Sequence, residues 1–264
     1  MGAFHVSPSA RLLAADEPAA FEIVNPQGRS PFVITCDHAG AVLPRAVGTL
    51  GVAASELRRH IAFDLGAAEL GRALAQRLDA FLILQTYSRL VIDVNRPPST
   101  PESIVTLSEL TAIPGNVGLT PEQRLAREQE IFGPYHARIE AELQRRADAG
   151  FPIALVALHS FTPSFKGVAR AWHGGILYGR DARLALPVLD QLRREDGLLI
   201  GDNEPYSVSD ETDYTVITHG ERRGLPYVEL EVRQDLIADA EGRTAWCDRL
   251  AHALEHAFAG LFRA

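Results

Sequence analysis

Short apolar runs of strand length recur along the sequence, and they constrain the fold more than any other feature. Several are apolar at every position, which is typical of strands that are covered on both faces of a sheet. Turn residues bound each run. The runs occupy residues 32–35, 80–84, 90–94, 153–158, 175–178 and 227–232.

Segments with helical spacing lie between these runs. In residues 54–78, the residues that recur on one side are Leu57, Ile61, Leu65, Ala68, Leu74 and Leu78. Similar patterns cover residues 121–149, 181–196 and 241–262. Strands that alternate with helices predict an α/β fold, in which helices cover both faces of a mostly parallel sheet.

The length and composition fit one domain. A chain of 264 residues can bury about three quarters of the surface that its unfolded form exposes. We expect residues 1–20, which hold two prolines, to form a loosely ordered arm and residues 21–264 to form a single domain. Residues 97–120 lack periodicity and hold four prolines, which predicts a long functional loop such as a lid.

The net charge of −8 argues against nucleic acid or an anionic membrane as a partner. Lys166 is the only lysine, so any attraction to an anionic ligand must come from a local cluster of arginines. No stretch approaches the roughly 20 apolar residues that span a bilayer, and the first residues lack the apolar core of a signal peptide. Cys36 and Cys247 are too far apart in sequence to suggest a local metal site. A reducing compartment is the simplest context for two such cysteines. We expect a soluble cytoplasmic protein.

Polar residues follow the apolar runs at four places, and ligands bind beyond the carboxyl ends of the strands in open α/β sheets. These places are residues 36–40 (CDHAG), 93–96 (DVNR), 159–162 (HSFT) and 229–233 (ELEVR). Two histidines at strand ends, together with nearby carboxylates, suit a catalytic zinc site. Such a site has three nitrogen or oxygen ligands and one position for water.

His38 and His159 are the two strand-end histidines. A single histidine of this kind is more often a capping or hydrogen-bonded loop residue, but the repeated arrangement puts metal ligation on an equal footing with that role. Asp64 lies four residues after His60, so both would share one face of the predicted helix. Asp64 could then reach the metal with His60 beside it, or the two could form a polar pair on the surface.

Glu229 and Glu231 alternate along one predicted strand and therefore point to the same side. Two acids on an apolar strand are costly unless they are paired or used, and one of them could act as a general base. Arg233 continues the same face and could grip a carboxylate with two hydrogen bonds. The alternative is an internal ladder of ion pairs between these residues.

Arg89 and Arg96 flank the run at 90–94 and could form a cationic pocket, or Asp93 could hold either of them in a structural ion pair. Among the other histidines, His173 and His219 fall in loops. We expect four more on the surface, namely His5, His136, His252 and His256.

Other hydrolytic and nucleotide-binding chemistries are not indicated. The sequence has no G-x-S-x-G elbow, no P-loop, no G-x-G-x-x-G after a strand and no H-E-x-x-H motif. Cys36 lies close to His38 and is a conceivable nucleophile, but a buried cysteine at a strand end is usually inert.

Six segments together resemble the N-formylglutamate amidohydrolase family, in particular a branch of its predicted members. They are CDHAG (36–40), HIAFDLGA (60–67), YSRLVIDVNRP (87–97), LHSFTP (158–163), GDNEPYS (201–207) and VELEVRQDLI (228–237). They follow the family's order over about 200 residues. Each segment is weak by itself, and the set is specific.

The resemblance implies a three-layer α/β/α sandwich related to zinc exopeptidases and amidases. It implies that His38, Asp64 and His159 hold a zinc ion and that Glu231 is the catalytic base. It also implies roles in shaping the site or binding the substrate for Arg89, Asn95, Arg96 and Arg233.

The implied reaction is zinc-dependent hydrolysis of the amide of a small anionic N-acyl amino acid, with N-formylglutamate as the first substrate to test. Two departures from the family pattern, Asp37 before His38 and Glu229 where relatives tend to carry Gln, add negative charge near the site. The alternatives are a zinc amidase acting on a peptide or cell-wall fragment and a silent binding protein that keeps the fold. We expect a monomer or a small homo-oligomer.

Overall fold

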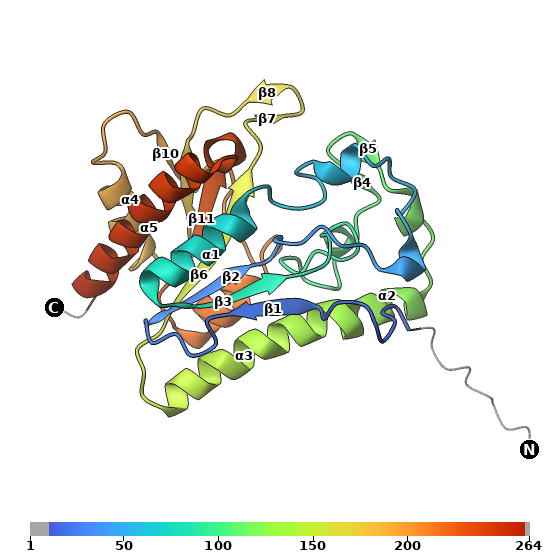
Figure 1. Cartoon of the computed structure of the whole chain (residues 1–264), viewed down its shortest axis with the longest axis horizontal. Helices are drawn as coiled ribbons and strands as arrows, with labels where there is room; N and C mark the ends of the chain where they lie inside the picture. Colours follow the sequence, from blue (N-terminus) through green and yellow to red (C-terminus); the bar gives the residue numbers. More distant parts are fainter. Residues whose placement is uncertain (1–10, 262–264) are drawn as a thin grey trace, which may run out of the picture.

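A seven-stranded mixed sheet forms the centre of the protein (Figure 1). The computed structural model describes residues 11–261. In spatial order the strands are β1 (Phe21–Val24), β3 (Phe81–Gln85), β2 (Phe32–Cys36), β6 (Ala154–Phe161), β11 (Tyr227–Arg233), β9 (Gly174–Leu177) and β10 (Ile200–Asp202).

Most neighbouring strands in this sheet are parallel, as the sequence predicts. β3, β2, β6 and β11 run in one direction, whereas β1 and β9 pair in the antiparallel sense with β3 and β11. The edge strand β10 is parallel to β9. Because β2, β6 and β11 are parallel neighbours, their carboxyl ends meet at one edge of the sheet.

Three helices cover one face of the sheet: α1 (Ala67–Leu78), α4 (Ala185–Leu192) and α5 (Ala240–Gly260) (Figure 1). Leu74 of α1 and Leu254 of α5 belong to the same buried cluster as Ile34, Val156 and Leu230 of the central strands. This apolar layer confirms the predicted helical segments at 181–196 and 241–262, although α4 is shorter than its pattern.

A long helical segment covers the other face. It consists of α2 (Pro121–Arg127), a π-helical turn (Glu128–Phe132) and α3 (Gly133–Asp148). The side chains of Tyr135, Ile139 and Leu143 pack in one buried cluster with Val33 and Leu155 of the sheet. The predicted helix at 121–149 is therefore confirmed, and the domain has the three-layer α/β/α architecture.

The run at 90–94 is not a strand, contrary to its apolar pattern. Its residues are buried, but side chains from elsewhere satisfy the backbone in place of a neighbouring strand. Asn116 donates to the carbonyl oxygen of Leu90, Arg127 to that of Val91 and His136 to that of Val94. Apolar composition predicted the burial of this run correctly and its backbone conformation wrongly.

The helix predicted from residue 54 begins only at Ala67, after Gly66 in a left-handed conformation (φ 79°). Residues 54–66 form turns and one short 3-10 helix (Glu56–Arg58). His60 and Asp64 therefore do not share a helix face, and the surface pair proposed for them is wrong because Asp64 is buried.

Two small hairpins complete the description of the loops. β4 (Leu107–Ser108) and β5 (Thr111–Ala112) lie within the predicted long loop, and β7 (Ser164–Phe165) and β8 (Val168–Ala169) follow β6. Further 3-10 or π-helical turns occupy Arg45–Val47, Pro101–Ser103, Pro114–Asn116, Val216–Gly220, Glu221–Arg223 and Gln234–Ile237.

The predicted arm is only partly described, because residues 1–10 lie outside the described range. In residues 11–20, the backbone N–H groups of Leu12 and Leu13 donate to the carboxylate of Glu130, and the side chain of Leu12 is buried. This part of the arm therefore packs on the domain. No helix within residues 11–261 combines the length and the apolar character that crossing a membrane requires.

Candidate functional site

The strand-end residues predicted from the sequence meet at the carboxyl edge of the central strands. Glu231 of β11 pairs in register with His159 of β6, and Glu229 pairs with Ala157. Alternation along the strands turns these side chains to the face that also carries Leu155 and Tyr227, opposite α1 and α5. His38 lies two residues beyond β2, the other neighbour of β6.

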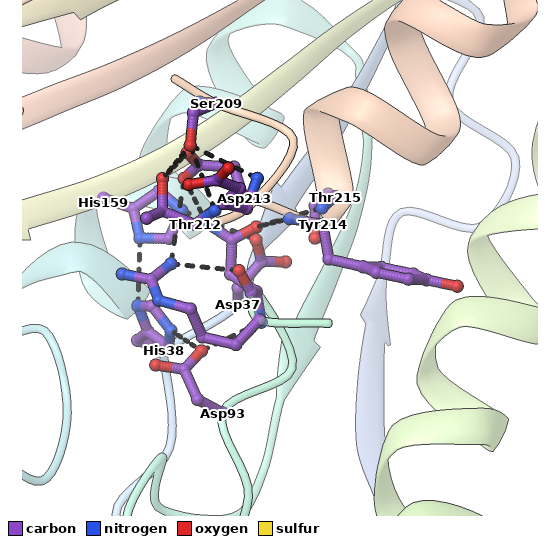
Figure 2. A network of polar contacts seen from close by, with 12 residues as sticks. Asp37, His38, Asp93, His159, Ser209, Thr212, Asp213, Tyr214 and Thr215 are labelled. Carbon is purple, nitrogen blue, oxygen red and sulfur yellow. Dashed lines mark hydrogen bonds and ion pairs between the residues drawn. The ribbon is translucent and has the colours of Figure 1, made fainter. Parts of the chain in front are cut away.

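Three donor atoms from different segments converge at this edge. His38 Nδ1 lies 3.1 Å from His159 Nδ1, which lies 3.0 Å from Asp64 Oδ2. The third side of the triangle, from His38 Nδ1 to Asp64 Oδ2, is 3.5 Å. All three residues are buried, and Figure 2 shows the two rings with their nitrogens facing each other.

A carboxylate stands behind each histidine. His38 Nε2 is hydrogen-bonded to Asp93 Oδ1 at 2.7 Å, whereas His159 Nε2 lies 3.5 Å from Asp37 Oδ2, within ion-pair distance but without a hydrogen bond (Figure 2). Tyr135 fixes Asp37 by donating its hydroxyl to the other oxygen at 2.7 Å. A proton held at Nε2 by a carboxylate leaves the lone pair of Nδ1 free, which is how proteins prepare histidine to bind a metal.

This donor set fits a metal ion. Ligands about 2.0–2.1 Å from a tetrahedral zinc lie about 3.3 Å from one another, close to the three distances in the triangle. Two ring nitrogens and a carboxylate oxygen are also the ligand types that catalytic zinc sites use, with a fourth position left for water. His38, Asp64 and His159 together could therefore hold a metal ion.

Glu229 and Glu231 are buried beside the triangle without partners. One oxygen of each has no hydrogen bond within residues 11–261. Burial raises the pKa of Glu231 to about 8. Burial, followed by the nearby carboxylate of Asp213, raises the pKa of Glu229 well above its usual range. The predicted ladder of ion pairs is thus absent from these two residues, and both stay available for chemistry.

Arg89 and Arg96 reach the same region but already have carboxylate partners. Arg89 Nη2 lies 2.6 Å from Asp93 Oδ2, and its Nη1 lies 3.6 Å from Asp64 Oδ1. Burial would raise the pKa of Asp93, but Arg89, followed by His38, holds it well below its usual range. Arg96 Nη1 lies 3.8 Å from Asp213 Oδ1.

Asn95 joins two loops rather than facing the site with a free amide. Its side-chain oxygen accepts the backbone N–H groups of Tyr214 and Thr215 at 3.1 and 3.0 Å, and its Nδ2 donates to Asp213 at 3.4 Å. Asp213 also accepts from the Thr212 hydroxyl at 2.8 Å. Asn95 therefore fixes the loop that carries Arg96.

Arg233 is directed away from this group. Its guanidinium donates to both oxygens of Asp235, at 2.8 and 3.2 Å, and to the carbonyl oxygen of Trp172 at 3.3 Å. It does not line the cavity described below, so the structure does not bring it together with the other predicted site residues.

A cavity of about 580 Å³ opens over the triangle. Its walls include parts of the loop that was predicted to be functional, from Glu102 to Glu109, as well as Phe165 of the β7–β8 hairpin and Tyr206. Two arginines, Arg89 and Arg96, line it. The carboxylates that line it are Asp64, Asp93, Glu102, Glu109, Asp213, Glu229 and Glu231.

Several residues of the site were not identified from the sequence. Asp37 was noted in the sequence only for its charge, and Asp93 only as an ion-pair partner, which it is for Arg89. Their places beside the two histidines were not predicted. Asp213 comes from an irregular loop, so no local pattern marks it. Tyr206 lies in the segment GDNEPYS that carries the resemblance, but its place in the cavity wall was not predicted. Cys36 is fully buried, and burial raises the pKa of its thiol, which disfavours a role as nucleophile.

His136 is buried, contrary to the prediction of a surface position. It stacks on His219, with ring centroids 5.2 Å apart, and its Nδ1 lies 3.0 Å from His219 Nε2. The sequence contains a signal that could have revealed this burial. His136 shares one helix face with three apolar residues, namely Phe132, Ile139 and Leu143. His252 and His256 are exposed as predicted, and His5 lies outside the described residues.

The histidine pair predicts a loss of stability in acid. His136 Nε2 donates to the carbonyl oxygen of Val94, so its Nδ1 must accept from His219 Nε2, and a second proton would set two donors against each other. Burial lowers the pKa of His136 to about 4 and that of His219 to about 3. The folded pKa values lie below the unfolded value of about 6.5, so this stability is complete above pH 6.5 and is lost as the pH falls toward 4.

We therefore expect the free energy of unfolding of His136→Gln to depend less on pH. Between pH 7 and pH 4.5 it should fall by about 1–3 kcal/mol less than that of the unmodified protein. The Gln amide can still donate to Val94 but does not titrate. Urea unfolding at both pH values measures the difference, and the exposed His252→Gln is the control. Equal slopes for His136→Gln and the unmodified protein would contradict the prediction.

Comparisons with known proteins agree with this geometry. Residues 30–238 match the family model of N-formylglutamate amidohydrolase. The crystal structure of gene product Atu2144 from Agrobacterium tumefaciens is 34% identical, with a TM-score of 0.92, over 95% of this chain and 99% of that one. The N-formylglutamate amidohydrolase from Ralstonia eutropha shares the fold, with 20% identity and a TM-score of 0.67 over 92% of this chain and 98% of that one. The comparison with curated proteins gave no match.

The family model spans most of the chain, including all three donors of the triangle and Glu231. The resemblance noted in the sequence is thereby confirmed. The chain belongs to the N-formylglutamate amidohydrolase family.

Proposed function

We propose that this protein is a metal-dependent amidohydrolase that cleaves the N-acyl amide of an acidic amino acid, with N-formylglutamate as the first candidate substrate. The observation that carries the proposal is the triangle of His38, Asp64 and His159, in which each histidine has a carboxylate at its other nitrogen. Family membership supports the amide as the bond that is cleaved.

Zinc is the metal that this donor set favours, and when bound it would polarise the acyl carbonyl and lower the pKa of water. Glu231 is the proposed base. Its carboxyl group lies beside His159 on the neighbouring strand and has an oxygen without a partner. We infer that Glu231 takes a proton from the attacking water and returns it to the leaving amine nitrogen.

Arg89 and Arg96 are the proposed substrate-orienting arginines that lie on the cavity. Arg89 acts partly through Asp93, because the same carboxylate binds both Arg89 and His38. Asn95 supports Arg96 through the loop contacts described above. The cavity volume of about 580 Å³ is within the range of sites that bind small molecules.

The proposal is tested by a hydrolysis screen of N-formyl, N-acetyl and N-succinyl amino acids, with and without a chelator. We expect release of the free amino acid from at least one N-formyl substrate, and loss of this activity with the chelator until zinc is restored. Activity that survives complete metal removal would contradict metal dependence. Cleavage of peptidoglycan fragments in preference to every N-acyl amino acid would instead favour the amidase alternative.

The proposed location is the cytoplasm. Cys36 and Cys247 are both buried and unpaired, which suits a reducing compartment. The negative net charge gives no reason to expect nucleic acid as a partner.

A further inference from the structure

Arg170 is the arginine near the cavity that has no carboxylate partner. The three arginines predicted from the sequence each form an ion pair: Arg89 with Asp93, Arg96 with Asp213 and Arg233 with Asp235. Within residues 11–261, no carboxylate lies within ion-pair distance of the Arg170 guanidinium, whose one side-chain hydrogen bond goes to a neutral hydroxyl.

Aromatic rings hold this guanidinium in place. Its Cζ lies 4.8 Å from the centroid of the Phe165 ring and 4.7 Å from that of Tyr206, and Nη1 donates to Tyr206 Oη at 2.7 Å. Phe161 adds a third ring at 5.8 Å. Rings that stack on a guanidinium orient it and leave the N–H groups at its edge free for a planar anion.

Tyr206 comes from a loop that the backbone places close against the sheet. A Cβ atom at Gly175 would lie 2.1 Å from the carbonyl oxygen of Glu204, and one at Gly201 would lie 2.5 Å from it. Only glycine permits this approach at both positions. The backbone N–H of Asn203 donates to Ile176 of β9 at 3.0 Å, which fixes the same loop.

The β7–β8 hairpin, which projects beyond the sheet in Figure 1, carries Phe165 and contacts the Arg170 guanidinium through it. We call this hairpin and the loop of Tyr206 together the clamp. The backbone N–H of Arg170 donates to the carbonyl oxygen of Pro163 at 2.8 Å and closes the base of the hairpin. The N–H of Lys166 at its tip donates to Glu109 Oε1 at 2.9 Å, which ties the hairpin to the cavity wall. Two segments about 35 residues apart thus hold one cation.

The two rings that hold this cation belong to the cavity wall, whereas the Arg170 side chain lies behind them and is not itself among the lining residues. Phe165 and Tyr206 line the same cavity as His159 and Glu231.

We propose that Arg170, held between Phe165 and Tyr206, binds a carboxylate of the substrate at the mouth of the cavity. The proposal rests on the proposed function, because an N-acyl amino acid carries at least one carboxylate. A guanidinium without an internal anion offers a carboxylate two parallel hydrogen bonds and meets no competing charge within its own clamp. Arg89 and Arg96 would have to give up part of an existing ion pair to do the same.

A binding experiment tests the proposal without relying on catalysis. Glutarate, a dicarboxylate with the length of the glutamate skeleton, is titrated by calorimetry into zinc-loaded protein and its variants. We expect Arg170→Met to weaken glutarate binding at least about tenfold and Arg170→Lys to restore part of the loss. Lys166→Met is the matched control, because Lys166 belongs to the same hairpin and its Nζ lies 5.4 Å from the same Phe165 ring. Equal affinities of Arg170→Met and the unmodified protein, or no glutarate binding by the unmodified protein, would overturn the proposal.

A kinetic panel then identifies the carboxylate. If Arg170 binds the side-chain carboxylate, Arg170→Met should lower kcat/KM about 10- to 100-fold on N-formylglutamate and much less on N-formylglutamine. If it binds the α-carboxylate, both of these substrates should suffer, and the α-amide N-formylisoglutamine should not. Equal losses on all three would indicate a structural role and would overturn the proposal. If the unmodified protein hydrolyses none of them, the proposed function fails, while the glutarate titration still decides the role of Arg170.

Discussion

Replacing His159 by Ala is expected to abolish stoichiometric metal binding. His159 Nδ1 lies within 3.1 Å of both other donor atoms, so its removal leaves two donors where a catalytic zinc needs three. We expect the purified protein to hold about one zinc per chain and His159→Ala and His38→Ala to hold almost none. Hydrolysis should fall with the metal. Metal analysis after dialysis against a weak chelator measures this.

His60→Ala is the matched control for this experiment. His60 lines the same cavity, but its Nε2 lies 3.4 Å from Glu109 and takes no part in the triangle. It should therefore keep the full complement of zinc. Full occupancy in both His38→Ala and His159→Ala would refute the assigned site. Only partial loss in Asp64→Ala would indicate that water or Glu231 completes the coordination.

The part of the site that lies on regular strands was predictable from sequence. Two rules sufficed: side chains alternate along a strand, and parallel strands end at one edge of a sheet. They placed His38 and His159 at strand ends and turned Glu229 and Glu231 to one side of a strand. The structure adds the strand order, in which Glu231 pairs in register with His159 and His38 lies just beyond the next strand. Arg233 obeys the same alternation, but the strand ends there and Asp235 captures its side chain.

The loops were not predictable in the same way. Asp64 was assigned to the metal through the family resemblance, while the helical spacing that linked it to His60 was wrong because the helix starts at Ala67. The run at 90–94 was misread because its backbone is satisfied by side chains more than ten residues away in sequence, such as Asn116. Local periodicity carries no information about such partners.

Arg170 is a further residue whose role cannot be predicted from the neighbouring sequence. Nothing near it in sequence distinguishes it from the other arginines. Within residues 11–261, Arg170 differs from the other arginines near the cavity because no carboxylate pairs with its guanidinium. Two aromatic rings contact it instead, those of Phe165 and of Tyr206, and Tyr206 comes from a distant loop. The motif GDNEPYS was recognisable as part of the resemblance, but only the fold shows that its tyrosine faces this guanidinium.

Glu231→Gln is expected to lower kcat by roughly 10²–10⁴-fold while the metal stays bound. Gln has nearly the same shape, and Oε2 of Glu231 has no hydrogen bond within residues 11–261 that the substitution would break. The change therefore removes the proton acceptor and little else. Sequence spacing alone does not choose between Glu231 and Glu229, because both lie on the same side of one strand.

The register of the sheet favours Glu231. It pairs with the proposed ligand His159, whereas Glu229 pairs with Ala157, two residues further from the strand ends where the triangle lies. Glu229 also lies close to Asp213, which suits a role in shaping the substrate subsite more than one in accepting the proton. Glu229→Gln should therefore change KM or substrate preference and keep kcat within about tenfold. Both variants should be measured on one substrate at matched zinc occupancy. If Glu229→Gln lowers kcat more than Glu231→Gln does, the base is Glu229, and proton transfer takes place two residues further from the end of β11.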